Sequence, residues 1–230
     1  DLERSEILCR AGEAIGLVIE RKGHYRLTRK GAVLIGLPGV TALIEHHKIL
    51  YQDLLNPVGF FKGVEETQLS KFWPYVFGGG MDLKSSEVEK YSDLMSESQH
   101  LVAADTLAAV NIPSVCRFLD VGGGKGTFVS ELKKIYPKVD AAVFDLPGSH
   151  SENSGHRCII GSFKEDELPA GYDIISLVRI LYDHRDETIR DLMGKTYNAL
   201  DKGGRLIVSE PMLGADRPTL WGDVYFAMYT

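Results

Sequence analysis

A run of glycines after a short apolar segment is the part of this sequence with the clearest chemical meaning. Residues 118–121 are predicted to form a buried strand, Gly122, Gly123 and Gly124 follow it directly, and a helix is predicted from Thr127. Glycine lets the backbone bend tightly and approach a ligand, because no Cβ stands in between. Backbone amides at the start of a helix attract anionic groups such as a carboxylate. The segment is therefore predicted to be a ligand-binding turn.

The spacing of the glycines separates two classes of nucleoside cofactor. A dinucleotide site has the pattern G-x-G-x-x-G, whereas here the next glycine is Gly126, and Thr127 stands where the last glycine of that pattern would be. Asp120 lies two residues before the first glycine, which completes the D/E-x-G-x-G-x-G pattern of methyltransferases. A purely structural turn and a nicotinamide site of irregular spacing are the alternatives.

A carboxylate is expected beside this turn. Asp145 ends the predicted second strand, a little beyond twenty residues from the glycines. A carboxylate at that place can accept both hydroxyls of a ribose, which either cofactor class offers. Asp145 therefore supports a nucleoside without identifying which one, and the alternative is a solvated turn residue.

Composition and charge exclude several other classes of protein. The chain has 230 residues, of which 44% are hydrophobic, and a net charge of −6, which argues against general nucleic-acid binding. The three cysteines form no Cys-x-x-Cys pair, and His46 and His47 have no second pair spaced as metal ligands, so no disulfide framework or metal site is predicted. No apolar run approaches the roughly 20 residues that span a bilayer. Residues 1–20 lack the pattern of a signal peptide, and we predict a cytoplasmic protein.

The elements that must position the turn are predicted to form an α/β domain over residues 86–230. A helix is predicted over 86–110, and after it strands alternate with helices through short turns. This order predicts a mostly parallel sheet with helices on both faces, and a ligand beyond the carboxyl ends of the strands. The predicted strands are 118–121, 140–144, 157–160, 173–178 and 205–209, and the predicted helices between them are 127–136 and 187–200.

Residues 1–85 are predicted to form a smaller, helical module. A helix, a hairpin over residues 17–28 and a further helix from Thr28 follow one another in the order of a winged helix. Five Lys or Arg residues fall within 21–30 without an acid, which leaves open a DNA-binding wing or, more commonly, a solvated surface. The sequence opens within a helical pattern and stops within another, so it is interpreted as cut at both ends.

Four segments together resemble a large O-methyltransferase family. They are 119–124, 144–147, 177–184 and 210–211. This family includes plant caffeate-type enzymes and bacterial polyketide and carotenoid enzymes. Segments 42–47, 72–75 and 222–226 look most like the hydroxyneurosporene and demethylspheroidene O-methyltransferases within it. A neighbouring branch, which methylates a ring carbon of bacteriochlorophyll precursors, has a similar segment around residue 180.

The resemblance implies a Rossmann-like domain that binds S-adenosyl-L-methionine and releases S-adenosyl-L-homocysteine. It also implies a homodimer, because the winged-helix-like module of the family serves dimerisation. The acceptor would be a hydrophobic small molecule with a hydroxyl, and Tyr91, Met95 and Tyr225 would contact it. If the acceptor is a carotenoid, the protein could also contact a membrane peripherally. The cofactor contacts that the resemblance implies are Asp120, Gly122, Gly123, Gly124, Asp145, Leu146, Ser162, Phe163, Val178 and Arg179.

The predicted catalytic group departs from the family pattern. Where the family has a histidine base, this chain has Tyr182, and His184 follows two residues later. His184 is the first candidate for the base, because histidine titrates nearest neutral pH, and Tyr182 would orient the acceptor. Glu210 resembles the acid that steadies the base. Ser162 replaces the family's adenine-side Asp, and residues 148–156 are shorter than the helix expected there.

Two other functions stay open on the sequence. One is C-methylation of a bacteriochlorophyll-type tetrapyrrole, and the other is a winged-helix regulator that uses the methyltransferase-like domain as a ligand sensor. The aromatic residues of segments 60–61, 72–77 and 221–226 either line an acceptor pocket or form a dimer core.

Overall fold

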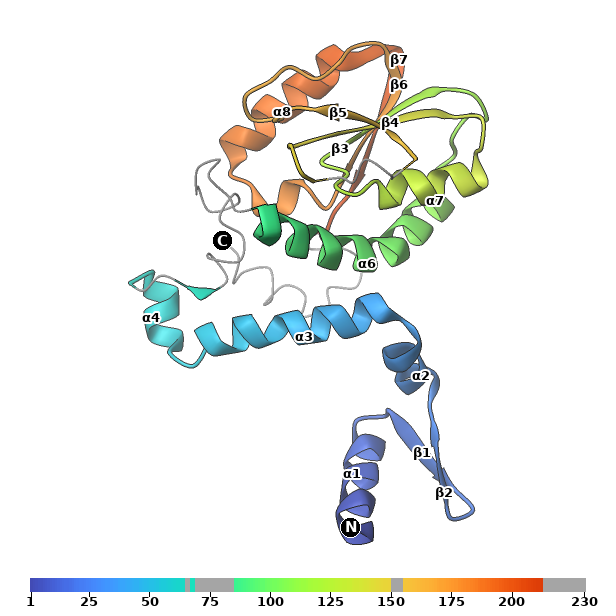
Figure 1. Ribbon diagram of the computed structural model, residues 1–230, viewed down its shortest axis with the longest axis vertical. Coiled ribbons are helices and arrows are strands. Elements are labelled where there is room, and N and C mark those ends of the chain that lie inside the picture. Colours follow the sequence, from blue (N-terminus) through green and yellow to red (C-terminus); the bar gives the residue numbers. More distant parts are fainter. Residues whose placement is uncertain (65–66, 69–84, 150–154, 213–230) are drawn as a thin grey trace. The chain divides into compact units, whose positions relative to one another are not determined.

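A computed structural model describes residues 1–64, 67–68, 85–149 and 155–212 of the chain (Figure 1). The chain divides into two compact units, Asp1–Lys48 and Ile49–Thr230. This boundary falls within helix α3 (Pro38–Asp53), whose last part belongs to the second unit. A functional division near residue 85, as inferred from the sequence, stays a prediction.

The first unit has the predicted order of helix, hairpin and helix. Helix α1 (Leu2–Ala14) is followed by strands β1 (Val18–Arg21) and β2 (His24–Leu27), which pair antiparallel, and by α2 (Arg29–Gly36). The turn between the strands has Lys22 at φ 54° and Gly23 at φ 76°, as a tight two-residue hairpin requires. The Thr28 hydroxyl accepts from the Gly31 amide and caps α2.

The second unit contains a five-stranded parallel sheet in the order β5-β4-β3-β6-β7. Strands β3 and β6 mark the point at which the strand order reverses, so a ligand is expected beyond their carboxyl ends. The mostly parallel sheet predicted from the sequence is confirmed. Its elements are α4 (Pro57–Lys62), α6 (Ser85–Ala109), β3 (Arg117–Val121), α7 (Thr127–Ile135), β4 (Asp140–Asp145), β5 (Arg157–Ile160), β6 (Tyr172–Val178), the 3-10 turn η1 (Leu181–Asp183), α8 (Asp186–Ala199) and β7 (Leu200–Ser209).

Helices cover both faces of this sheet (Figure 1). Neighbouring strand residues alternate between the two faces. Phe118 packs with Phe128 of α7 and Leu107 of α6 on one face. Leu119, the next residue of β3, packs with Leu192 of α8 on the other. Burial of apolar side chains on both faces accounts for the nearly continuous apolar runs of the central strands.

Strand β7 begins five residues earlier than the sequence predicts, directly after α8. Its pairing with β6 shifts register between Tyr172 and Ile174, where Gly203 adopts φ 81°. Gly204 lies so close to the backbone oxygens of Asp201 and Asp173 that a side chain would not fit. The two glycines therefore form an irregularity within the strand, and not the end of the helix.

Within the described residues, no single helix is long and apolar enough to cross a membrane, although the bent pair Arg29–Gly36 and Gly39–Asp53 passes on length and composition alone. The same part of the chain contains no group of three or more metal-ligating side chains.

Candidate functional site

The glycine turn joins β3 to α7 at the carboxyl end of the central strand. Gly122, Gly124 and Gly126 have φ of 69°, 54° and 76°, which residues with a Cβ rarely adopt. A Cβ at Gly122 would collide with Ile180, and one at Gly123 would collide with the Asp120 carboxylate. At Gly124, by contrast, no atom of the described residues lies within 4 Å of the place of a Cβ. The backbone at Gly124 thus borders open space.

The Asp145 carboxylate lies against this turn, as predicted. Its Oδ2 accepts from the Gly124 amide (2.6 Å), and its Oδ1 accepts from the Leu146 amide (2.6 Å). The contact follows from the sheet, because β3 and β4 are neighbours in register and end at the same edge. The structure therefore brings Gly124, Asp145 and Leu146 together.

Asp120 lies beneath the turn and is 1% exposed. Its Oδ1 accepts from the Ser176 hydroxyl (2.6 Å), and its Oδ2 has no hydrogen-bond partner among the described residues. Burial raises the pKa of Asp120 to about 7, against the hydrogen bond from Ser176, and the Asp145 charge raises it further. Ser176 was not predicted from the sequence, although a serine within a buried strand needs a polar partner and so signals a contact of this kind.

The structure also brings together two predicted residues from different strand ends, Phe163 after β5 and His184 after η1. The rings of Phe163 and His184 meet edge to face, with centroids 5.3 Å apart. Burial, together with the Lys164 charge, lowers the pKa of His184 to about 4. The imidazole is therefore neutral at pH 7 but a weak base. The Ser162 amide donates to Asp166 (2.8 Å), and the Lys195 ammonium donates to the Phe163 oxygen (2.9 Å), which holds this segment in place.

Glu210 holds the turn that carries Tyr182. Its Oε1 accepts from the amides of Ile180 (2.6 Å) and Leu181 (2.8 Å). Burial raises the pKa of Glu210, while hydrogen bonds from the backbone of residues 180–182 and the Arg179 charge lower it. Tyr182 itself lies in η1 and is partly buried. The predicted pair Tyr182 and Glu210 is thus brought together through the backbone of one short turn.

The other predicted residues are placed as follows. Val178 is 6% exposed and packs in the core, so its side chain faces away from open space. The guanidinium of Arg179 contacts Met95 and neighbouring residues of α6. Tyr91 is on α6, but its side chain lies outside the described part of the chain, as does all of Tyr225.

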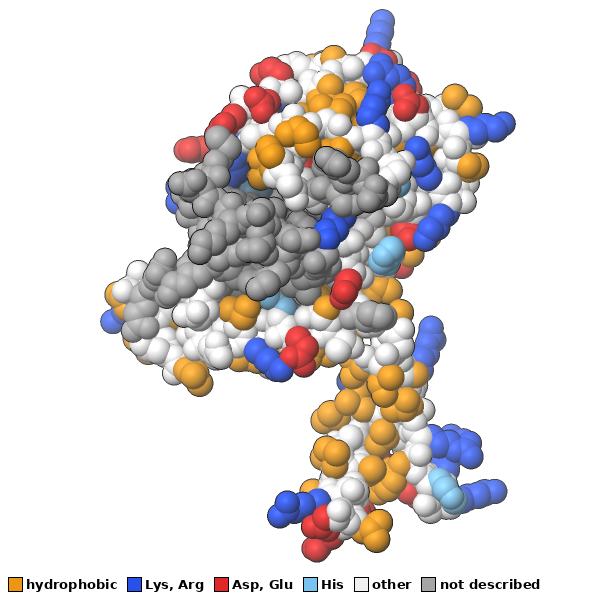
Figure 2. Space-filling model, in the orientation of Figure 1, with side chains coloured by type: hydrophobic (Ala, Val, Ile, Leu, Met, Phe, Trp, Pro, Cys, Tyr) orange, Lys and Arg blue, Asp and Glu red, His pale blue; other side chains and the backbone are white. Residues whose placement is uncertain are grey.

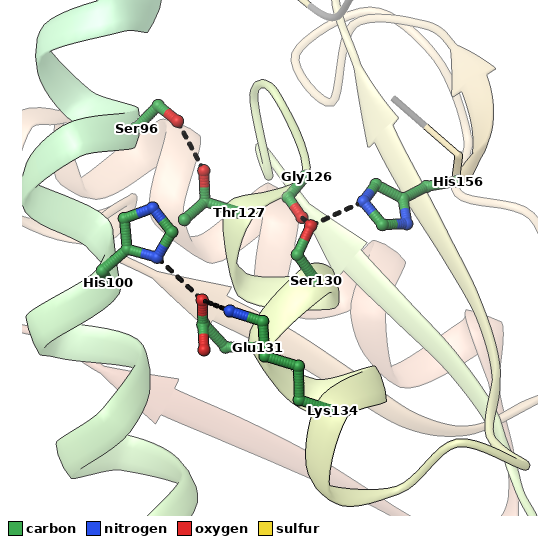
Figure 3. Close-up of polar contacts among 8 residues, drawn as sticks. All are labelled: Ser96, His100, Gly126, Thr127, Ser130, Glu131, Lys134 and His156. Atoms are coloured by element: carbon green, nitrogen blue, oxygen red, sulfur yellow. Dashed lines mark hydrogen bonds and ion pairs between the residues drawn. The ribbon is translucent and has the colours of Figure 1, made fainter. Parts of the chain in front are cut away.

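A set of polar side chains around the start of α7 was not predicted from the sequence (Figure 3). The Ser130 hydroxyl donates to the Gly126 oxygen (3.0 Å) and shares a hydrogen bond with Nε2 of the His156 ring (2.7 Å). Ser96 of α6 bonds to Thr127, the first residue of α7 (2.6 Å). Burial lowers the pKa of His156, so its ring is neutral at pH 7. These contacts fix the helix that begins at the turn.

Comparisons with known proteins identify the family of this chain. Residues 51–230 match the O-methyltransferase domain family. The chain is 44% identical over 232 residues to the demethylspheroidene O-methyltransferase of Rhodobacter capsulatus and 43% identical over 239 residues to that of Cereibacter sphaeroides. Each alignment covers 99% of this chain but only 59% and 63% of the relative, so the chain spans about three fifths of their length.

Solved structures show the same fold. Human N-acetylserotonin methyltransferase, solved in complex with S-adenosylmethionine, superposes with a TM-score of 0.73 at 21% identity and covers 100% of this chain with 72% of its own. The pyocyanin biosynthetic protein PhzM superposes with a TM-score of 0.75 at 18% identity, over 100% of this chain and 72% of PhzM. With a domain match over residues 51–230 and two relatives above 40% identity, this chain belongs to the O-methyltransferase family.

Proposed function

We propose that this protein transfers a methyl group from S-adenosylmethionine to a hydroxyl of a hydroxylated carotenoid or a related hydrophobic pigment. The open backbone at Gly124 beside the Asp145 carboxylate is the observation that carries the proposal. The names of the two bacterial relatives support the acceptor class, since both alignments cover 99% of this chain.

The residues at the turn fit this cofactor. Gly124 leaves room for a ligand, and the start of α7 offers amides to an anionic group such as the amino-acid carboxylate. The Asp145 carboxylate accepts the amides of Gly124 and Leu146, and as a carboxylate at this edge it is the group that we propose accepts the ribose hydroxyls. Phe163, which follows β5, and His184, which follows η1, form an aromatic pair, and we assign it to the adenine. His184 is thus proposed as a wall of the cofactor site instead of the base.

The chain's own residues would align the acceptor. When bound, the cofactor supplies a methyl group activated by its sulfonium. Tyr182 would donate a hydrogen bond that orients the acceptor oxygen, and Glu210 fixes the turn from which Tyr182 extends. As the oxygen–methyl bond forms and the methyl–sulfur bond breaks, the hydroxyl proton of the acceptor would pass to solvent. Alignment for in-line displacement supplies a large part of the acceleration, and small misplacements are costly.

The acceptor and cofactor halves of this proposal can be tested separately. Calorimetric titration of the full-length protein with S-adenosylhomocysteine tests the cofactor, and the expected result is saturable binding that is weakened in Asp145→Ala. Glu187→Ala, on the exposed start of α8, is the control. No binding heat with folded protein would contradict the proposal.

Product analysis distinguishes the chemistry. Incubation with a hydroxycarotenoid is expected to give a methyl ether, identified by mass spectrometry. A carbon-methylated tetrapyrrole as the product would instead show the alternative activity. Binding to DNA that weakens with salt and is lost in Lys22→Ala with Arg26→Ala would favour the regulator.

We further propose a homodimer formed through the first unit. Helix α1 buries none of its residues, and Figure 2 shows apolar side chains gathered over this unit. Leu2, Leu8 and Ile35 are 91%, 73% and 72% exposed. Apolar surface on this scale is typical of an interface. Sedimentation analysis of Leu8→Glu tests the proposal, and a dimer unaffected by that change would contradict it.

A further inference from the structure

Helix α6 is tied to the carboxyl edge of the sheet at three places. Ser96 bonds to Thr127, directly after the glycine turn (2.6 Å). Thr106 bonds to Ser209, the last residue of β7 (2.6 Å). Between these two ties, the Arg179 guanidinium reaches α6 from the end of β6. One helix thus contacts the cofactor side and the side of Tyr182.

The backbone of Arg179 is in an unusual conformation. Its φ is 60°, and among the described residues Lys22 is the other non-glycine with positive φ. The Arg179 amide donates to the Ser209 oxygen (2.9 Å), and the next two amides converge on Glu210. Glycine would adopt this conformation without strain. An arginine at this position therefore indicates that its side-chain contacts have a function that offsets the strain.

Among the described residues, the Arg179 side chain forms its hydrogen bonds with neutral partners on α6, while its charge also acts on the Glu210 carboxylate. One guanidinium nitrogen donates to the Ser98 hydroxyl (2.8 Å) and to the Gln99 side-chain oxygen (3.4 Å), and the other donates to the Met95 sulfur (3.1 Å). No ion pair joins Arg179 to a carboxylate within the described part of the chain. The planar fork of arginine serves several acceptors at once, which the single ammonium of lysine cannot reproduce.

We propose that Arg179 is a positioning residue for methyl transfer. It holds Met95 and residues 98–99 of α6 at a fixed place relative to the turn that carries Tyr182. Because Ser96 ties the same helix to the start of α7, Arg179 also fixes the spacing between the cofactor and acceptor sides. This inference rests on the proposed function. In-line methyl transfer slows when the reacting atoms are misplaced by about 1 Å, so a group that fixes their spacing affects the rate.

The test replaces the side chain while keeping the backbone conformation. Arg179→Gly is expected to lower kcat by about 10- to 100-fold, with the affinity for S-adenosylhomocysteine within about threefold of wild type. Arg179→Lys is expected to rescue only a small part of the loss, because it restores the charge but not the fork. Lys22→Gly is the matched control. It relieves the backbone strain at the other non-glycine residue of positive φ among the described residues, which lies in the first unit. Its kcat is expected to equal that of wild type.

A double variant tests whether Arg179 acts through α6. Ser98→Ala alone is expected to lower kcat less than Arg179→Gly does. Added to Arg179→Gly, it is expected to lower kcat no further, since coupled residues are not additive. Hydrogen exchange of the amides of residues 95–99 is expected to accelerate in Arg179→Gly and not in Lys22→Gly.

Each outcome decides for or against this role. Unchanged kcat in Arg179→Gly, or additive effects with Ser98→Ala, would overturn it. A loss of cofactor affinity as large as the loss of kcat would assign Arg179 to the cofactor site instead. If the wild type transfers no methyl group, the proposed function fails. Hydrogen exchange at residues 95–99 then still decides whether Arg179 holds α6.

Discussion

Two glycines with the same backbone demand but different places in the fold allow a sharp test of the cofactor site. Gly124 lies in the turn after β3, and Gly203 lies near the amino end of β7. Their φ values are 54° and 81°, and at both positions an added Cβ would meet none of the chain's described atoms within 4 Å. Alanine at either place is therefore opposed by backbone strain alone, which is about 1–2 kcal/mol.

The two variants should be equally destabilised but should differ in binding. For a chain of this length, 1 kcal/mol lowers Tm by roughly 2–4 °C, so each variant is expected to melt about 2–8 °C below wild type. Only Gly124→Ala puts a methyl group into the space beside Asp145. Its affinity for S-adenosylhomocysteine is expected to fall at least tenfold, or about 1.4 kcal/mol.

Calorimetric titration and thermal unfolding of both variants provide the measurement. Gly203→Ala is expected to bind S-adenosylhomocysteine like wild type despite its lower Tm. Equal affinity in the two variants would refute the placement of the cofactor at Gly124, because strain would then be the whole effect.

Three further predictions concern the titratable residues of the site. The raised pKa of Asp120 means that the folded protein keeps a proton that the unfolded chain releases above about pH 4, so stability falls as pH rises from about 4 to 7. Urea unfolding of Asp120→Asn should show a smaller fall over that range, and an equal fall would contradict the shift. Glu210→Ala leaves two amides unpaired and should lose about 1.5–3 kcal/mol of stability, whereas Glu210→Gln, which keeps an acceptor, should lose less; denaturant unfolding compares them. Because the pKa of His184 is about 4, His184→Phe and wild type should have pH profiles of kcat with the same shape from pH 5.5 to 8, and a limb near pH 6.5 that disappears in the variant would show His184 to be the base.

The sheet and the turn could be predicted because their signals are local. Central strands are buried on both faces, so they appear in the sequence as short apolar runs, and β3, β5 and β6 lie within one residue of the predicted bounds. Glycines after a strand and an acid at the end of the next strand then placed Gly124 and Asp145 at one edge.

The side-chain contacts could not be predicted, because they join residues far apart in the sequence. Arg179 reaches Met95 across 84 positions, and Glu210 reaches Ile180 across 30. The early start of β7 depends on a register shift against β6, which has no signal within β7 itself. The burial of Asp120 follows from the strands around it, so its pKa could not be inferred from its motif.

Because all strands of the sheet run in the same direction, residues at their amino ends can be changed without touching the proposed site at their carboxyl ends. The amino-terminal end of the sheet lies away from the proposed cofactor site. There the Arg117 amide donates a hydrogen bond to Asp173 (2.7 Å), and Lys202 is exposed. Reporter dyes, immobilisation chemistry and thermostabilising changes belong there, where they leave the reactive end undisturbed. A fluorescent label at Lys202 would report unfolding of the sheet without changing the affinity for the cofactor.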